Sequence, residues 1–267
     1  MKISIITATY NSEAHLEACL KSIYTQSGDI EHIVIDGGST DGTLAILDKY
    51  RDEISYLISE PDDGISSAFN KGIAQCSGSL VGIVSSDDYL MPGAINKIEE
   101  DWKQNGEVDV LYGDVVFDEG TDTKFIVKPD TDLSVIWKRQ PLKHASVFVR
   151  TEVYQDLGGF DSKWRCAMDY DLILRFYTNQ RTFRYLPVAL AAVRPGGFSY
   201  DNLGKTMRET CQIAESYGAS KISSRLNLIR KYLRVQLRAL VLTKGFRRVL
   251  MVYRKRSSRF EVLPSDK

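Results

Sequence analysis

The chain has 267 residues, of which 43% are hydrophobic and 26% are charged, and its 35 basic side chains balance 35 acidic ones. These proportions are typical of a folded globular protein and exclude a collagen-like, disordered or disulfide-scaffold chain. No apolar stretch is long enough for a membrane-spanning helix, and the first residues carry no signal-peptide pattern. Four scattered cysteines without metal-ligand spacing indicate reduced thiols, so we expect a cytoplasmic protein.

The first 90 residues alternate between strand-like and helix-like segments. The predicted strands cover residues 3–7, 32–35, 54–59 and 80–84, and the predicted helices cover 12–26, 43–50 and 66–75. Asn11 or Ser12 is expected to cap the first helix, because a short side-chain oxygen satisfies a free backbone N–H. The alternation predicts an α/β fold with a Rossmann-like, mostly parallel central sheet flanked by helices.

The second half of the chain mixes strands and helices without a repeat. Its predicted helices cover residues 92–104, 168–178 and 201–217, with another beginning at Thr151. Its predicted strands cover 108–112, 125–127, 144–149 and 184–193, and the last of these is expected to break at Pro187.

The charge is distributed unevenly along the chain. Residues 221–260 contain 13 Lys or Arg and no Asp or Glu, whereas residues 1–220 are strongly acidic. Leu226, Ile229, Leu233, Leu237, Leu240 and Val241 fall on one helical face of this basic segment. A basic amphipathic helix predicts binding to an anionic membrane surface, although the same face also fits pairing with a second copy in a homodimer. The acidic body argues against nucleic acid as a partner.

Polar loops follow the first four predicted strands, at the edge where parallel sheets bind ligands. Asp87 and Asp88 come directly after the fourth strand, and adjacent carboxylates that repel each other are suited to hold Mg²⁺ or Mn²⁺ with a phosphate. The alternative is that this pair caps the helix starting near Pro92.

A glycine-rich loop follows the second predicted strand, with the sequence Asp36-Gly37-Gly38-Ser39-Thr40-Asp41-Gly42. Its glycines permit close approach of the backbone to a ligand, and Asp36 is able to accept a hydrogen bond from a base or ribose. The loop matches neither the dinucleotide-binding fingerprint nor the P-loop, and an ordinary strand-to-helix turn is the alternative.

Taken together, these segments resemble the family 2 glycosyltransferases with the GT-A fold. The resemblance rests on residues 4–11 (Ser-Ile-Ile-Thr-Ala-Thr-Tyr-Asn), on the Asp36 loop, on Asn70-Lys71-Gly72 and on Ser86-Asp87-Asp88. It covers about residues 1–200 of this chain. The segments at 59–65 and 111–114 resemble a subgroup that builds bacterial O-antigen and capsular polysaccharides.

The resemblance implies a role for each matching residue. Residues of the first loop (Ala8, Thr9 and Tyr10) would hold the base of a nucleotide sugar, and Asp36 falls on the nucleoside-binding aspartate pair, whose second acid is Gly37 here. Asp63, Asn70 and Lys71 would lie near the donor, with Lys71 offsetting phosphate charge. Asp88 would ligate Mg²⁺ or Mn²⁺, and Asp87 would meet the ribose or a metal-bound water.

The resemblance also places the catalytic base in the second half. The family's acid pair before a helix appears here as Met168-Asp169, so Asp169 is the implied base, and Asp171 is the second candidate. A helix N-cap is the alternative role for Asp169. A match to a His-x-Ser segment of the subgroup implies an acceptor or diphosphate contact for His144, with a structural role as the alternative. Trp164 is a candidate to stack on a sugar ring, with core packing as the alternative, and Asp171 is a further acceptor candidate.

The sequence thus predicts an inverting, metal-dependent glycosyltransferase that moves a sugar from a nucleotide donor, UDP-linked by resemblance, to a lipid-linked saccharide. It would work at the inner face of the cytoplasmic membrane. Residues 1–218 would form the catalytic domain, with a donor half (1–115) and an acceptor half (116–218), and residues 219–267 the membrane-associating tail. The alternatives are a nucleotidyltransferase acting on sugar phosphates and a non-catalytic nucleotide-binding subunit.

Overall fold

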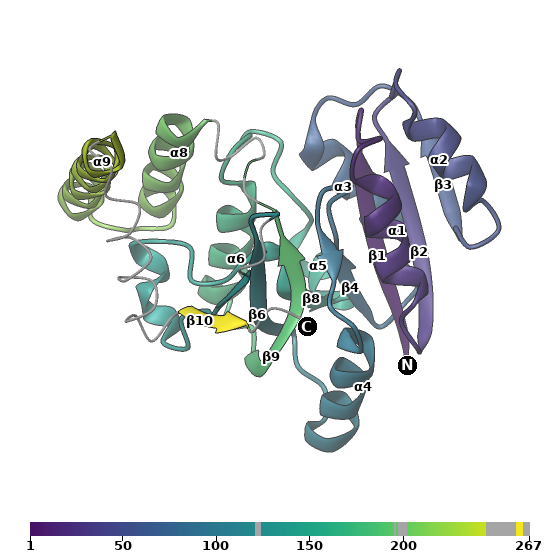
Figure 1. The fold of residues 1–267 in the computed structure, drawn as a ribbon. Helices are drawn as coiled ribbons and strands as arrows, with labels where there is room; N and C mark the ends of the chain where they lie inside the picture. The colour runs from purple at the N-terminus through teal and green to yellow at the C-terminus, as the bar shows by residue number, and fades with distance from the viewer. Residues whose placement is uncertain (121–123, 195, 197–201, 244–259, 264–267) are drawn as a thin grey trace.

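The computed structural model describes residues 1–120, 124–194, 196, 202–243 and 260–263. In this part of the chain, ten strands form one sheet with helices on both faces (Figure 1). The central path of the sheet runs β10-β7-β6-β8-β4-β1-β2-β3. The predicted α/β architecture with a mostly parallel N-terminal sheet is confirmed.

The N-terminal half is a parallel sheet whose strands lie in the order β4-β1-β2-β3. These strands are β1 (Lys2–Thr9), β2 (Asp29–Asp36), β3 (Tyr56–Ser59) and β4 (Leu80–Ile83), connected by α1 (Leu16–Tyr24), α2 (Thr43–Lys49) and α3 (Ile65–Gln75). β4 is buried along its whole length and β1 at all but its first residue, which explains their continuous apolar sequences.

The second half adds antiparallel strands to β4. These are β8 (Val147–Arg150), β6 (Val110–Asp118), β7 (Lys124–Val127) and β10 (Phe260–Leu263). β9 (Phe183–Val193) runs parallel to β6 and pairs with the short strand β5 (Tyr89–Leu90). The predicted break at Pro187 is wrong: β9 continues, because its pairing with β6 shifts register on either side of Asp114 and so accommodates the proline.

Helices of the second half complete the fold. They are α4 (Ala94–Asn105), α5 (Thr151–Leu157), α6 (Met168–Thr178), α8 (Leu203–Ser216) and α9 (Lys221–Thr243), with short 3₁₀ turns η1 (Leu133–Trp137) and η2 (His144–Ser146). The sequence did not predict η1, β5 or β10, which lack a periodic pattern of sufficient length.

The expected cap of α1 is also wrong. α1 begins at Leu16 after His15, and no side chain caps it. The backbone carbonyl of Ser12 instead accepts hydrogen bonds from the N–H groups of His15 and Leu16. Asn11 adopts a positive φ of 47°, and the Ser12 hydroxyl is 2.8 Å from that of Ser86. These two residues therefore shape the loop after β1.

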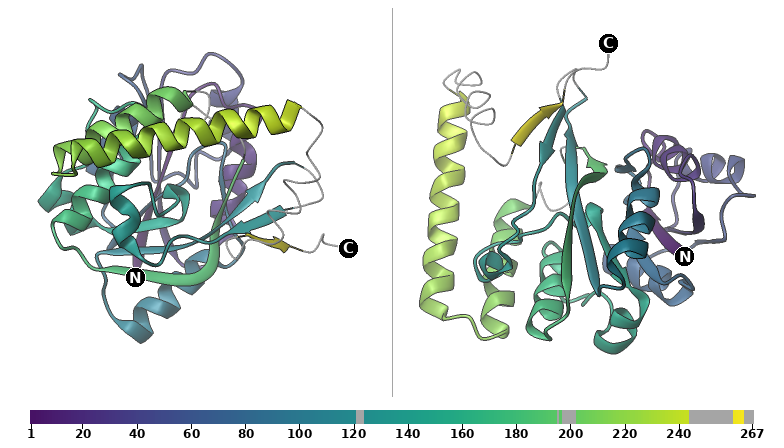
Figure 2. Two further views of the ribbon diagram at one scale, coloured as in Figure 1. Left: turned by 90° about the vertical axis from the view of Figure 1, so that its left-hand side faces the viewer. Right: turned by 90° about the horizontal axis from the view of Figure 1, so that it is seen from below.

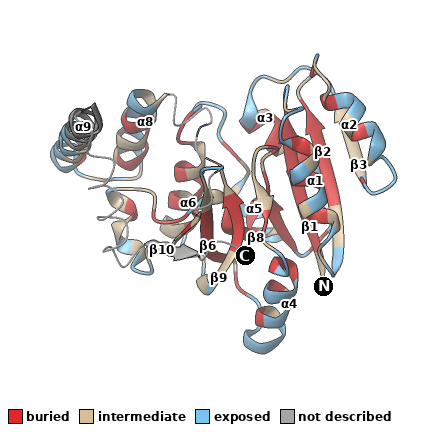
Figure 3. Cartoon of the chain, in the orientation of Figure 1, coloured by how far each residue is buried: buried red, intermediate tan, exposed pale blue. Residues whose placement is uncertain are grey.

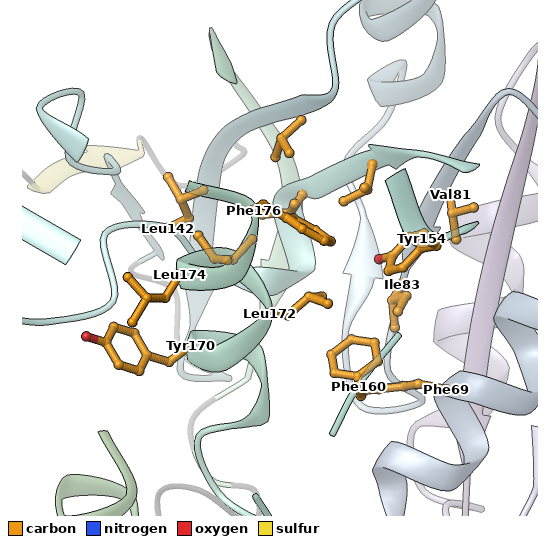
Figure 4. Close-up of a cluster of buried hydrophobic side chains, with 14 of the residues drawn as sticks. Phe69, Val81, Ile83, Leu142, Tyr154, Phe160, Tyr170, Leu172, Leu174 and Phe176 are labelled. Atoms are coloured by element: carbon orange, nitrogen blue, oxygen red, sulfur yellow. The ribbon is translucent and has the colours of Figure 1, made fainter. Parts of the chain in front are cut away.

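A large apolar cluster joins the two halves of the molecule (Figures 3 and 4). Phe69 of α3 packs on Phe160 with ring centroids 5.1 Å apart, and Figure 4 shows this pair together with Leu172 and Phe176 of α6. Because the cluster is continuous from α3 to α6, the start of α6 is held in a fixed position relative to the N-terminal half.

α9 lies at the outer side of the molecule, next to α8, in all three views of Figures 1 and 2. It is separated from β3 and α2 by the width of the sheet. Within the described residues, none of the helices combines the length and apolar character needed to cross a bilayer.

Candidate active site

Asp36, at the carboxyl end of β2, is fully buried, and its carboxylate is saturated by the chain itself. It accepts hydrogen bonds from the backbone N–H groups of Gly38 (3.1 Å) and Ser39 (3.0 Å). The hydroxyls of Ser39 (2.5 Å) and Ser59 (2.6 Å) donate two more. These bonds fix the glycine-rich loop and tie it to the end of β3, so they favour a structural role for Asp36 over direct contact with a base.

The end of β1 presents an aromatic ring above this loop. Ala8 and Thr9 are buried, whereas Tyr10 is 62% exposed. A Cβ on Gly37 would lie 3.4 Å from Tyr10 Cδ2, so the tyrosine ring lies close to the backbone of this glycine. Among the described residues, Thr9 Oγ1 is buried without a partner. An exposed ring at a strand end is suited to stack on a planar base.

The loop after β3 carries an ion-pair cluster that the sequence did not predict. Lys71 Nζ lies 2.6 Å from Asp62 Oδ1 and 2.7 Å from Glu60 Oε1. The second oxygen of Asp62 would be 3.6 Å from a Cβ on Gly37, whereas Asp63 is exposed. The hydrogen bonds that Lys71 donates to the two acids raise its pKa. Asp62 and Asp63 are adjacent acids in a polar loop, and the sequence does not indicate which of the two faces inward.

Asn70 connects α3 to the segment before α6. Its Nδ2 donates to the carbonyl of Phe160 and its Oδ1 accepts from the Phe160 N–H, both at 2.8 Å. A Cβ on Gly159 would lie 2.2 Å from Asn70 Oδ1, so glycine is required for this close approach. The two bonds favour a clamping role for Asn70 over contact with donor phosphates.

Asp87 and Asp88 follow β4 and are both partly buried. They do not cap a helix, because α4 begins at Ala94 after Gly93 and has no side-chain cap. Burial, and then the charge of Asp87, raises the pKa of Asp88 to about 7, against the opposing effects of a backbone hydrogen bond and the charge of Arg194. This carboxylate is therefore poorly compensated by the chain alone.

Arg194, at the end of β9, reaches this loop. Its guanidinium donates to the carbonyl of Asp87 at 2.5 Å and lies 5.2 Å from the centre of the Tyr89 ring. The glycine-rich segment that begins at Arg194 is a candidate flap over the donor by its sequence, but the contact of Arg194 with the Asp87 loop was not predictable. Arg194 lies 106 residues from Asp88, and the pairing of β9 with β5 brings the two segments together.

The donor set of this loop fits a hard divalent cation in part. Two carboxylates offer oxygen ligands, which Mg²⁺ and Mn²⁺ prefer. Within the residues that the structure describes, no group of three His, Cys, Asp or Glu side chains converges to complete a metal site. The remaining ligands would have to be phosphate oxygens and water, as is usual for Mg²⁺.

Asp169 is the second residue of α6, so it is not the N-cap, which is Ala167. Its Oδ1 accepts from the N–H of Tyr170 at 2.8 Å. Its Oδ2 accepts from Nε2 of Gln140 at 3.2 Å. Asp169 is partly buried, and each of its two carboxylate oxygens accepts one of these bonds.

Glu209 of α8 organises the turn that leads to Asp169. Its buried carboxylate accepts from the backbone N–H groups of Arg165 (3.3 Å), Cys166 (2.7 Å) and Ala167 (3.0 Å). This long-range contact has no signature in the sequence, because Glu209 is one of several acids on an amphipathic helix. It fixes the backbone immediately before α6.

The three implied acceptor residues lie in different environments. Asp171 is buried and pairs with Arg175 at 2.5 Å, and Tyr217 donates to its other oxygen at 3.2 Å. Trp164 is also buried, within the large apolar cluster. Both arrangements favour structural roles.

His144 instead lies near Asp169, between two aromatic rings. Its ring is stacked on Phe69 and edge-on to Phe160, with centroids 6.0 and 5.5 Å away. Burial lowers the pKa of His144, and the charge of Asp169 opposes this effect. The structure therefore brings His144 and Asp169 together, while it assigns Asp171 to a buried ion pair.

Known proteins resemble this chain in sequence. The family model described as Glycosyl transferase family 2 matches residues 4–154. A PGL/p-HBAD biosynthesis glycosyltransferase of Mycobacterium bovis is 27% identical over 246 residues, which are 90% of this chain and 94% of that protein. An uncharacterized glycosyltransferase of Mycobacterium tuberculosis is 33% identical over 179 residues, 65% of this chain and 68% of its own length.

Solved structures share the fold. TarS 1–349 of S. aureus, in complex with UDP-GlcNAc, has a TM-score of 0.64 and 21% identity, covering 85% of this chain and 70% of that one. This chain spans 42% of the longer TarS chain. The mannosyltransferase PcManGT of Pyrobaculum calidifontis, in complex with GDP-Man and Mn²⁺, has a TM-score of 0.61 and 16% identity, covering 92% of this chain and 81% of its own. With the GT-A fold and a family match over more than half of its length, the chain belongs to glycosyl transferase family 2 and is a glycosyltransferase.

Proposed function

We propose that this glycosyltransferase transfers a sugar, with inversion, from a nucleotide-sugar donor to a lipid-linked saccharide in cell-surface polysaccharide biosynthesis of the O-antigen or capsule type. The observation that carries the donor half of the proposal is the poorly compensated pair Asp87 and Asp88 at the sheet edge where Tyr10 is exposed. The two solved neighbours are complexes with UDP-GlcNAc and with GDP-Man and Mn²⁺, and a UDP-sugar is the donor proposed here.

In the proposed reaction, Asp169 takes the proton of an acceptor hydroxyl as that oxygen attacks the anomeric carbon opposite the leaving nucleoside diphosphate. The bond to the diphosphate breaks as the new glycosidic bond forms, so the anomeric configuration inverts. Tyr10 holds the base, and Lys71 is available to the phosphates if the donor displaces Asp62 and Glu60 from it. Asp88 and Asp87 would hold Mg²⁺ or Mn²⁺, which supplies positive charge to the departing diphosphate.

Thermal unfolding with a panel of nucleoside diphosphates, with and without Mn²⁺, tests donor binding directly. Ligand at about 100 times its dissociation constant adds about 2.7 kcal/mol to the free energy of unfolding. We expect UDP to stabilise the protein only when Mn²⁺ is present, and Asp88→Ala to remove this effect. Equal stabilisation of Asp88→Ala would refute the metal role of Asp88.

Asp169→Asn tests the proposed base. We expect turnover to fall by about 10²- to 10⁴-fold while the stabilisation by UDP and Mn²⁺ is retained, since the base acts on the acceptor and not on the donor. Release of UDP from UDP-GlcNAc in the presence of acceptor gives the rate, and the configuration of the new glycosidic bond in the product, determined by NMR, gives the stereochemistry. Near-normal turnover in Asp169→Asn would place the base elsewhere.

The membrane association is proposed from the exposed face of α9. Ile222, Leu226, Ile229 and Leu233 are each between 49% and 74% exposed, and their spacing of four, three and four residues puts them in one stripe. Arg225 and Arg230 are exposed and flank the stripe by the same spacing. An apolar stripe bordered by cations, in a segment without acids, favours an anionic bilayer as its partner. The side chains of Leu237, Leu240 and Val241 lie outside the described ones.

Co-sedimentation with vesicles of phosphatidylcholine and phosphatidylglycerol tests this surface. We expect Leu226→Glu combined with Ile229→Glu to lose about 3 kcal/mol of apolar contact and so more than tenfold in binding. Leu44→Glu, at an exposed leucine of α2, is the matched control and should bind normally. Unchanged vesicle binding in the double variant, or a dimer that this variant abolishes, would indicate that a second copy covers the stripe.

A further inference from the structure

A short loop between η1 and η2 delivers Gln140 to the proposed base. Asp130 holds the loop on both sides of this residue: its carboxylate pairs with Arg139 at 2.8 Å, and its N–H donates to the carbonyl of Pro141 at 3.1 Å. Leu142, two residues further on, is buried in the large apolar cluster (Figure 4). Gln140 is therefore fixed by contacts other than its own amide.

The amide of Gln140 is only half satisfied. Its Nε2 donates to Asp169 Oδ2 at 3.2 Å, and because a carboxylate only accepts, this bond sets the orientation of the amide. Its oxygen, Oε1, is consequently turned away, buried and without a partner among the described residues. A buried acceptor without a donor is destabilising, so an apolar side chain of the same size would suit this position better for stability alone.

We propose that Gln140 is a positioning residue for the reaction: its amide holds the Asp169 carboxylate in the orientation in which the other lone pairs of Oδ2 face the acceptor hydroxyl. The inference rests on the proposed role of Asp169 as base. Tyr170 N–H fixes Oδ1 from within α6, and Gln140 fixes Oδ2 from a different loop. The two bonds together leave the carboxylate no free rotation, which is what proton abstraction at a defined atom requires.

This role predicts that stability and activity change in opposite directions. Gln140→Leu keeps the volume of the side chain and removes both the bond to Asp169 and the unpartnered oxygen. We expect its melting temperature to equal or exceed that of the wild type, while release of UDP from UDP-GlcNAc with Mn²⁺ falls by about 10- to 100-fold. Gln104→Leu, at an exposed glutamine of α4, is the matched control and should leave both quantities unchanged.

Gln140→Glu separates hydrogen bonding from space filling. It has the shape of glutamine but offers Asp169 a second carboxylate instead of a donor, so turnover should fall at least as far as in Gln140→Leu. A residue that only fills space would tolerate this isosteric change best. Turnover of Gln140→Glu near the wild-type value would therefore overturn the proposal.

Combining Gln140→Leu with Asp169→Asn distinguishes failure of the proposed positioning role of Gln140 from failure of the proposed role of Asp169 as base. If Asp169→Asn loses turnover, adding Gln140→Leu should reduce the residual rate no further, because both variants disable the same group. A further loss, or a lowered melting temperature in Gln140→Leu together with its lost activity, would show a role independent of the base. If Asp169→Asn keeps its turnover, the proposed function itself fails.

Discussion

Two carboxylates lie at the carboxyl ends of neighbouring parts of the parallel sheet, one at the end of β2 and one in the loop after β4. Their hydrogen-bonding environments are opposite. Asp36, after β2, accepts four hydrogen bonds from the loop around it. Asp88, after β4, lies beside another carboxylate, and burial raises its pKa to about 7. The first carboxylate therefore stabilises the fold, whereas the second destabilises it when it is ionised.

The comparison distinguishes a carboxylate with a structural role from one that is available to a ligand, and it does so without reference to the reaction. A carboxylate saturated by backbone N–H groups and hydroxyls has no capacity left for a substrate. One that is desolvated with few donors retains capacity for a ligand, at the expense of stability. The same contrast distinguishes Asp171, which is paired with Arg175, from Asp169, whose two oxygens each accept one hydrogen bond.

Neutralising Asp88 tests this contrast with the largest expected change in the free energy of unfolding. With a pKa of about 7 in the folded state against an ordinary 3.8, ionisation disfavours folding increasingly as pH rises through this range, by up to about 4 kcal/mol. Asp88→Asn should therefore be more stable than the wild type at pH 8 without metal, and the difference should vanish below about pH 4. Urea denaturation at both pH values measures it, and a variant no more stable at pH 8 would contradict the contrast.

Neutralising Asp36 should change the free energy of unfolding in the opposite direction. Asp36→Asn turns an NH₂ group toward donors that need an acceptor, and we expect a loss of about 3 kcal/mol in the free energy of unfolding. Asp48→Asn, on the exposed side of α2, is the control and should change stability little. If Asp36→Asn were as stable as the wild type, the loop would not depend on this carboxylate.

His32, a buried histidine within β2, adds a second pH-dependent contribution to the stability. His32 contacts Tyr24 (2.6 Å) and Thr7 (3.0 Å), and burial lowers its pKa from 6.5 to about 3. The unfolded chain therefore binds this proton first, so stability falls by about 1.4 kcal/mol per unit as pH drops below 6.5.

His32 and Asp88 thus oppose each other between about pH 4 and 6.5, because the histidine gains stability with rising pH and the aspartate loses it. We expect His32→Gln to be stabilised relative to the wild type at pH 5 and to lose this advantage by pH 7. Denaturation curves of the wild type and the variant across this range measure the difference. A difference that does not vary with pH would show that His32 is not neutral in the folded protein.

The fold of the N-terminal half was predictable from the sequence, because its apolar periodicity extends over whole strands and helices and its loops are polar. Helix α6 was also predicted with the bounds that the structure shows. Three side-chain contacts were not predictable: Glu209 on the turn before α6, Gln140 on Asp169, and Asp62 beside Gly37. Each joins residues that the tertiary fold alone brings together, so no local pattern encodes it.

The position of α9 has a consequence for how the two substrates reach the enzyme. Glu209 attaches α8 to the turn before Asp169, and α9 packs on α8 at the side of the molecule farthest from β3 (Figure 1). If the stripe of α9 lies on a bilayer as proposed, the side of the molecule that carries α8 and α9 would face the lipid, and β3 would lie on the side that faces the water. A water-soluble donor and a lipid-borne acceptor would then enter from two phases, and neither would obstruct the path of the other.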